Sequence, residues 1–261
     1  MAIVISIANQ KGGVAKTTSC LNIGAALGQA GYKTLLVDFD PQSSLTKILN
    51  RENQTIRYVG DWLQNRCVFT DVVQRSPHEN LDYLPSHIHL RGDEMDMQKD
   101  FINGNEFLSI KLQEVGAEYD FVLIDTLPSL SLLCINALFA SQFVLIPSKM
   151  DYVSIGGLSQ LTRLIADVKK KKPIEILGVF STIYRTGVKR QERCYNELKA
   201  IFPSHVLRAK IRINAAIEEA AYEGLPVTYL DSQCRGAQDY HELTKEILQR
   251  CPLKKKAVPV A

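Results

Sequence analysis

The sequence lacks any pair of cysteines in a C-x-x-C arrangement, although it contains six cysteines among 261 residues. Zinc ribbons and thioredoxin-like dithiols both use such close pairs, so both kinds of site are disfavoured. Free cysteine behaves as a small buried hydrophobic residue. We therefore expect reduced, structural thiols.

Long apolar runs are also absent, since no segment reaches the roughly 18 to 20 apolar residues that a membrane span needs. The first residues lack the basic region and the small-residue cleavage site of a secretory leader. No repeat, long linker or low-complexity tract divides the chain. These absences predict a cytoplasmic protein with one domain over residues 1–252 and a flexible tail over residues 253–261.

The net charge of +3 conceals an asymmetry between the two parts of the chain. Residues 1–161 contain 12 Lys and Arg against 17 Asp and Glu, or −5, whereas residues 162–261 contain 19 against 11, or +8. A positive half indicates an anionic partner or, alternatively, only a solvated charged surface.

Short apolar runs alternate with segments of helical periodicity. Strands are predicted at Ile3–Ala8, Thr34–Val37, Phe121–Ile124, Phe143–Pro147 and Ile176–Ser181, and helices at Thr17–Ala30, Val153–Lys172 and Cys234–Arg250. Residues 50–118 are irregular and predict small helices with one further strand near Leu81–Leu84. The alternation predicts a single-domain α/β fold, a mostly parallel twisted sheet with helices on both faces.

A glycine-rich loop follows the first strand and reads Lys-Gly-Gly-Val-Ala-Lys-Thr-Thr over residues 11–18. The standard phosphate loop has Gly, four residues, Gly, Lys and Ser or Thr. Here Gln10 replaces the first Gly, and Ala15 precedes Lys16 in place of the second. Gly12 and Gly13 can still turn successive N–H groups around phosphate oxygens at the start of a helix.

Side chains of this loop and of two later strand ends supply the remaining chemistry. Lys16 is placed to reach the β- and γ-phosphates, and Thr17 to complete a Mg²⁺ shell. Asp38 and Asp40 follow one predicted strand, and Asp125 follows another. Phosphoryl transfer needs such positive charge, a metal and an oriented water, so the pattern predicts an ATPase.

The loop, with its additional lysine at position 11, resembles the deviant Walker A motif of the ParA/MinD ATPases, a deviant branch of the P-loop NTPases. The resemblance implies ATP and Mg²⁺ as cofactors and a homodimer that forms around ATP, with Lys11 touching the partner's nucleotide. It implies catalytic roles for Lys11 and Lys16, and for Asp40 as the residue that orients the attacking water. It implies that Thr17, Asp38 and Asp125 hold the metal. The nucleotide would contact Lys11, Gly12, Gly13, Val14, Ala15, Lys16, Thr17 and Thr18, with adenine near Pro226 and Asp231. Thr126-Leu127-Pro128 departs from the family's second switch, which leaves its shape and the turnover rate open.

Segments beyond the loop are similar to the ParA and Soj branch, among them Pro147–Gly157, Ile211–Asn214 and Gly224–Val227. This branch implies chromosome or plasmid partition by a nucleoid-associated dimer, which binds DNA without sequence preference until a ParB-type partner stimulates slow hydrolysis. Such binding relies on cations facing phosphates, and the candidates are Arg185, Lys189, Arg190, Arg208 and Arg212.

Two alternatives remain open at this point. A MinD-like membrane-surface ATPase that positions division would need a C-terminal amphipathic helix with bulky apolar anchors, which Leu253–Ala261 lacks. A low-turnover regulatory protein would bind ATP and a partner while barely hydrolysing it.

Overall fold

The computed structural model describes residues 2–50, 57–115 and 117–252. The strands are β1 (Ile3–Ile7), β2 (Thr34–Phe39), β3 (Gln74–Arg75), β4 (Leu81–Leu84), β5 (Phe121–Thr126), β6 (Phe143–Lys149), β7 (Glu175–Tyr184) and β8 (Val206–Arg212). They form one sheet in the order β3-β4-β2-β5-β1-β6-β7-β8, in which β3 alone is antiparallel to its neighbour. The predicted mostly parallel α/β fold is confirmed, and the predicted tail lies outside the described residues.

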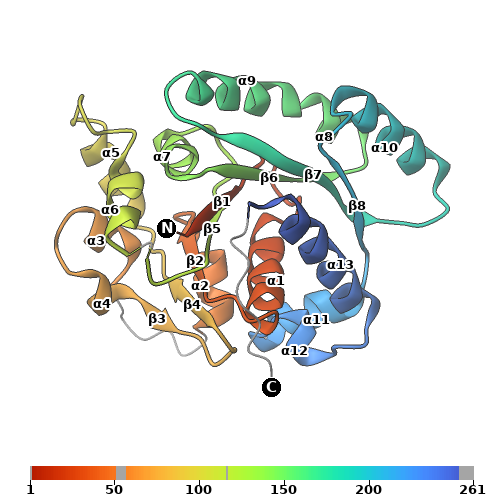
Figure 1. Cartoon of the computed structure of the whole chain (residues 1–261), viewed down its shortest axis with the longest axis horizontal. Coiled ribbons are helices and arrows are strands. Elements are labelled where there is room, and N and C mark those ends of the chain that lie inside the picture. Colours follow the sequence, from red (N-terminus) through yellow and green to blue (C-terminus); the bar gives the residue numbers. More distant parts are fainter. Residues whose placement is uncertain (1, 51–56, 116, 253–261) are drawn as a thin grey trace.

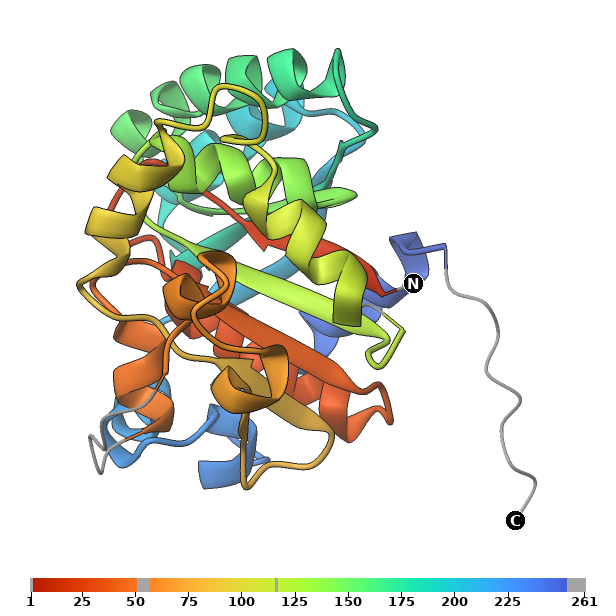
Figure 2. The same cartoon turned by 90° about the vertical axis from the view of Figure 1, so that its left-hand side faces the viewer.

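Helices cover both faces of the sheet (Figure 1). They are α1 (Lys16–Gln29), α2 (Ser44–Leu49), α3 (Val59–Leu63), α4 (Phe69–Val72), α5 (Leu90–Met97), α6 (Phe107–Val115), α7 (Leu132–Ala140), α8 (Tyr152–Gly156), α9 (Leu158–Lys169), α10 (Lys189–Ile201), α11 (Ala215–Glu223), α12 (Val227–Leu230) and α13 (Arg235–Arg250). Helices α1 and α13 pack side by side on one face, whereas α7, α9 and α10 lie on the other. Figure 2 shows the small helices α3 to α6 grouped over β2 and β5.

Alternate residues of each central strand supply the two cores. Ile5, Leu36 and Leu123 point towards α1 and α13, whereas their neighbours Leu35 and Val122 point towards α3 and α6. All five are fully buried. A strand buried on both faces has no polar side to reveal a period of two, which is why each appears in the sequence as an unbroken apolar run.

Helix α1 lies unusually close to the sheet because two of its residues lack side chains. A β-carbon at Gly24 would collide with Leu36, and one at Gly28 would overlap the carbonyl oxygen of Glu79. The two glycines therefore allow close packing of α1 on its neighbours, which fixes where α1 begins relative to β1.

Three expectations about secondary structure were wrong or incomplete. The segment Val153–Lys172 is two helices, α8 and α9, because the chain turns at Gly157 between them. The described part of residues 50–118 contains two strands, since β3 forms a two-residue antiparallel pair with β4. Helix α10 follows β7 although no helix was predicted there: only Cys194, Tyr195 and Leu198 of its residues are buried.

No helix within the described ranges is both long and apolar enough to cross a membrane.

Candidate nucleotide site

The glycine-rich loop connects β1 to α1 at the carboxyl edge of the sheet. Strand β1 pairs in parallel with β5 on one side and β6 on the other, so three strands end beside the loop. Open α/β sheets bind ligands at such a place. Val14 is buried, and its carbonyl oxygen accepts a hydrogen bond of 3.1 Å from the Thr182 hydroxyl. Gly12 borders open space, so the loop is anchored at Val14 and accessible at its glycines.

Two residues of the loop have left-handed backbone conformations. Gly13 has φ of 68°, and Ala15 has φ of 64° and ψ of 37°. Ala15 thus retains the backbone conformation for which the ordinary loop uses glycine. A left-handed conformation costs a residue with a β-carbon roughly 1–2 kcal/mol. The alanine therefore strains the loop without changing its path.

Replacing Ala15 with glycine should relieve this strain. We expect Ala15→Gly to raise the free energy of unfolding by about 1 kcal/mol, because the gain exceeds the entropy that glycine adds to the unfolded chain. Urea unfolding measures the change. Ala166→Gly, at an exposed position in the interior of α9, is the matched control and should lower stability by roughly 0.5–1 kcal/mol. Equal destabilisation by both substitutions would contradict the left-handed assignment.

Two lysines border the loop. Lys16 is buried, and its Nζ lies 3.4 Å from the carbonyl oxygen of Lys11. Burial lowers the pKa of Lys16, while the negative charges of Asp125 and Asp40 oppose that effect. The second is Lys149, whose Nζ would lie 3.7 Å from a β-carbon at Gly13. A concave loop with exposed backbone N–H groups and two ammonium groups suits a polyphosphate.

The sequence did not identify Lys149 as a site residue. It is the last residue of β6, the neighbour of β1. The available signal was its position at a strand end, but only the strand order shows that this end lies beside the loop.

Asp38 and Asp125 face each other across neighbouring strands. They are register partners in β2 and β5, and both are fully buried. Asp38 accepts hydrogen bonds from the Thr46 backbone at 2.8 Å and the Thr46 hydroxyl at 2.6 Å. Burial raises the pKa of Asp38 to about 6, although the bonds from Thr46 oppose the shift. In this structure Asp38 holds α2 against the end of β2, and its role as a metal ligand stays a prediction.

Asp125 has unsatisfied oxygens. Within the described parts of the chain, neither carboxyl oxygen has a hydrogen-bond partner at ordinary distance and angle. Burial and then the charge of Asp38 raise its pKa, while Thr17 and Lys16 act in the opposite direction. A buried carboxyl group without partners is costly, and a divalent cation with its water would satisfy it. Asp125 and the Thr17 hydroxyl therefore fit Mg²⁺, which prefers oxygen ligands.

Asp40 lies just beyond β2 in a half-exposed turn. Its Oδ1 accepts a hydrogen bond of 2.8 Å from the backbone of Gln42, and its carbonyl oxygen accepts one of 2.8 Å from the Ser86 hydroxyl. Its negative charge opposes the fall in the pKa of Lys16, so the two side chains interact electrostatically. Asp40 is thus fixed at its backbone while one carboxylate oxygen remains available to a water.

Lys11 is held within its own chain. Its Nζ lies 3.1 Å from Oδ1 of Asp151 and 2.8 Å from the Ser154 hydroxyl. Asp151 also caps α8 by accepting a hydrogen bond of 2.8 Å from the Ser154 backbone. Both side chains of the ion pair are about one-third exposed, so the pair is weak and can exchange. Neither partner of Lys11 was identified from the sequence.

The segment predicted to lie near adenine packs along α1. Pro226 is buried at the start of α12, and the next backbone N–H donates a hydrogen bond of 2.7 Å to Asn22 of α1. Asp231 is exposed and accepts hydrogen bonds from Gln233 and Cys234. Thr18 joins the same side, since its carbonyl oxygen accepts from the Asn22 amide. The segment therefore packs against α1, the helix that begins within the phosphate loop.

The five basic candidates separate into two groups. Arg185 is exposed in the loop after β7, and Lys189 and Arg190 are exposed in the first turn of α10. Arg212 pairs in register with the end of β7 but is committed to the buried Asp239, with Nη2 2.6 Å from Oδ1. Arg208 is exposed earlier on β8. Three exposed candidates, Arg185, Lys189 and Arg190, thus lie at one edge. They are next to Arg212, which is already paired with Asp239.

Comparison with known proteins gives consistent results across the chain. Residues 2–176 match a family model described as an AAA domain. The chain is 36% identical to the chromosome-partitioning ATPase Soj of Treponema pallidum over 96% of its own length and 98% of that protein. It is also 36% identical to the sporulation initiation inhibitor protein Soj of Bacillus subtilis, covering 95% and 98% of the two chains.

A solved structure resembles the whole fold. Cobyrinic acid a,c-diamide synthase from Mycobacterium smegmatis, with bound ADP and magnesium, has a TM-score of 0.83 and 28% sequence identity, and each chain is covered to 95%. A structural relative therefore binds a nucleotide and magnesium on this fold.

Proposed function

Because the chain belongs to the Soj/ParA family of chromosome-partitioning ATPases, we propose that its ATPase cycle controls how long a dimer stays on DNA. The observation that carries the proposal is the loop at residues 11–18, which contains Lys16 and exposed glycines. Lys149 of β6 lies beside Gly13, and Asp125 has carboxyl oxygens without a well-formed hydrogen bond. Partition in this family requires an ATPase, and these residues supply the charges for one.

The chain's own residues divide the work of hydrolysis. Lys16 and Lys149 place positive charge along the phosphates, where negative charge spreads during phosphoryl transfer. Thr17 and Asp125 would hold Mg²⁺, which would supply positive charge to offset the negative charge of the phosphates. Asp40 would orient the attacking water, because its carboxylate interacts electrostatically with Lys16 while its backbone is fixed by Ser86.

Lys11 provides the proposed link between ATP and dimer formation. In the described chain its ammonium is occupied by Asp151 and Ser154. A partner's triphosphate carries more charge than one carboxylate, and a charge-assisted contact to it would be the stronger one. Lys11 would then leave Asp151 and complete the nucleotide site of the second subunit. A single chain would hydrolyse ATP slowly because its own site lacks the lysine that a partner would supply.

The proposed DNA surface is the edge formed by Arg185, Lys189 and Arg190. Their exposure and spacing suit phosphate contacts, which carry no sequence information. A ParB-type partner would end the bound state by stimulating hydrolysis, and the dimer would be found on the nucleoid. Arg212 is a weaker candidate because Asp239 already neutralises it.

Substituting all three residues at this edge with glutamine should abolish most DNA binding in the presence of ATP and Mg²⁺. Three lost phosphate contacts would reduce the slope of log affinity against log salt by about 2.7 on duplex DNA. Binding to random-sequence duplex DNA across a salt series measures it. The matched control replaces Lys169, Lys170 and Lys171, which are exposed at the end of α9, and should leave the slope nearly unchanged.

The same salt series on anionic liposomes tests the membrane-surface alternative. Binding to liposomes without binding to DNA would reject the partition proposal. Equal losses in the two triple variants would show instead that binding depends on net charge and not on this edge.

A further inference from the structure

A pocket lies at the carboxyl edge of the sheet and contains none of residues 11–18. It has a volume of about 910 Å³ and opens at the carboxyl ends of β2 and β4, between α2 and α3. Sites for small ligands usually measure roughly 300–1,000 Å³, so the volume suits a compact molecule better than a polymer.

One wall of this pocket is cationic. Lys47, Arg57 and Arg66 line it against a single lining carboxylate, Asp61. The Arg57 side chain is 56% exposed and only 3.7 Å from Asp61, a long contact that a better anion could replace. Arg66 remains 43% exposed although it is bound from behind. The three cations face two carboxylates, Asp61 from the lining and Asp93 behind Arg66, so the wall keeps a net positive charge that favours an anion.

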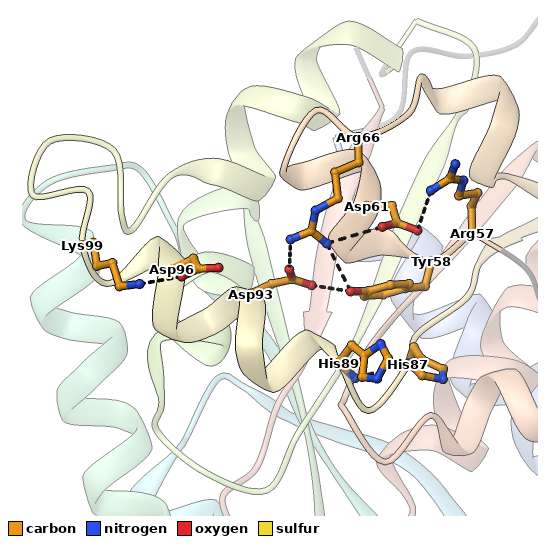
Figure 3. Close-up of polar contacts among 9 residues, drawn as sticks. All are labelled: Arg57, Tyr58, Asp61, Arg66, His87, His89, Asp93, Asp96 and Lys99. Atoms are coloured by element: carbon orange, nitrogen blue, oxygen red, sulfur yellow. Dashed lines mark hydrogen bonds and ion pairs between the residues drawn. The ribbon is translucent and has the colours of Figure 1, made fainter.

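A second part of the lining consists of rings, and it adjoins the cations because the Tyr58 hydroxyl accepts a hydrogen bond of 3.4 Å from Nη1 of Arg66. Tyr58 lies with its ring centroid 5.5 Å from His87, and the centroids of His87 and His89 are 4.4 Å apart. Figure 3 shows the two imidazoles next to the Tyr58 ring, on the side away from Arg66. Both histidines are exposed and their rings are inclined by 73°, so a planar group can stack on one imidazole while its edge meets the other.

These walls are held rigidly by Asp93, which is 3% exposed. It accepts hydrogen bonds from the Tyr58 hydroxyl at 2.8 Å and from Nη2 of Arg66 at 2.6 Å (Figure 3). A β-carbon at Gly60 would overlap both the Asp93 carboxylate and the Tyr58 ring. The arginine and the ring are therefore positioned before any ligand arrives, which lowers the entropy lost on binding.

The floor of the pocket leads to the catalytic carboxylates. Ser86 donates its hydroxyl to the carbonyl oxygen of Asp40 at 2.8 Å, and its backbone N–H donates to the Thr46 hydroxyl at 2.8 Å. That hydroxyl in turn donates to Asp38. A ligand resting on Ser86 and Thr46 would thus touch the segment that positions Asp40.

We propose that this pocket is a second, regulatory site for a small phosphate ester with a planar ring, the chemistry of a nucleotide. The phosphate would lie between Lys47 and Arg57, and the ring against His87 and His89. The site is separate from the proposed DNA surface, and its occupancy would change the rate of ATP hydrolysis through Ser86.

The test uses AMP as the probe and the full chain previously saturated with ADP and Mg²⁺, so that the phosphate loop is filled. Calorimetry should show one saturable AMP site per chain. Lys47→Gln combined with Arg57→Gln should weaken it at least about tenfold, because two charged contacts are lost. Lys16→Ala, which removes the loop's own lysine, should leave the AMP site intact and so separates this proposal from the loop. Lys99→Gln, outside the pocket on an exposed lysine, is the matched control.

Three results would overturn the proposal. The first is no saturable AMP binding to the ADP-saturated protein. The second is inorganic phosphate binding the site as tightly as AMP does, which would leave the rings without a role. A short DNA strand that binds where AMP does not would overturn it equally. The third is an ATP hydrolysis rate that AMP changes by less than about twofold in the unmodified protein, or equally in the Lys47 and Arg57 double variant.

Discussion

Lys16→Ala is expected to lose almost all ATP binding. The ammonium of Lys16 is buried at the base of the loop, 3.4 Å from the Lys11 carbonyl oxygen, with Asp125 and Asp40 close enough to act on its pKa. Its removal deletes charge-assisted contacts to the phosphates, each worth about 1.5–3 kcal/mol. The affinity should fall by at least roughly 100-fold.

The neighbouring carboxyls increase the effect. The charge of Lys16 lowers the pKa of Asp125. Without Lys16 the buried carboxyl group would hold its proton more tightly and would bind Mg²⁺ less well. Calorimetry with ATP and Mg²⁺ measures the loss, and sedimentation should show no ATP-dependent dimer. Lys33→Ala, at an exposed lysine outside the site, is the control. Affinity within about threefold of the unmodified protein would remove Lys16 from the site.

Much of this arrangement could be predicted from the sequence because local chemistry determines it. Buried parallel strands require unbroken apolar runs, and Gly12 and Gly13 mark a backbone that must approach phosphates closely. Carboxylates that end such strands, as Asp38 and Asp125 do, necessarily meet at one edge. These signals depend on short stretches of chain, so they survive without knowledge of the tertiary structure.

The residues that were missed depend on strand order and on distant partners. Lys149 lies beside Gly13 only because β6 is the neighbour of β1. Asp151 holds Lys11 across 140 positions of sequence. Asp239 neutralises Arg212, and no local pattern marks it as a partner. A side chain's availability for a ligand is set by what the fold has already placed against it.

Asp40→Ala is expected to separate ATP binding from ATP hydrolysis. The carboxylate of Asp40 acts electrostatically on Lys16, but it supports neither a strand nor a helix, since its hydrogen bond goes to Gln42 two residues away. A positioned group that orients or deprotonates a nucleophile contributes typically 10²–10⁴-fold in rate. Hydrolysis should therefore fall at least about 100-fold, while ATP affinity changes only a few-fold. Phosphate release and calorimetry measure the two quantities.

A conservative variant distinguishes the two roles that Asp40 could have. Asp40→Asn keeps an oxygen that can accept the hydrogen bond from Gln42 and so preserves the turn, but it removes the negative charge. If the charge acts on water, the asparagine variant should hydrolyse ATP nearly as slowly as the alanine variant. Both should then form ATP-dependent dimers that remain on DNA longer than the unmodified protein. Recovery of hydrolysis in Asp40→Asn would assign Asp40 to the turn alone, and the attacking water would then have to be oriented by another group near Lys16.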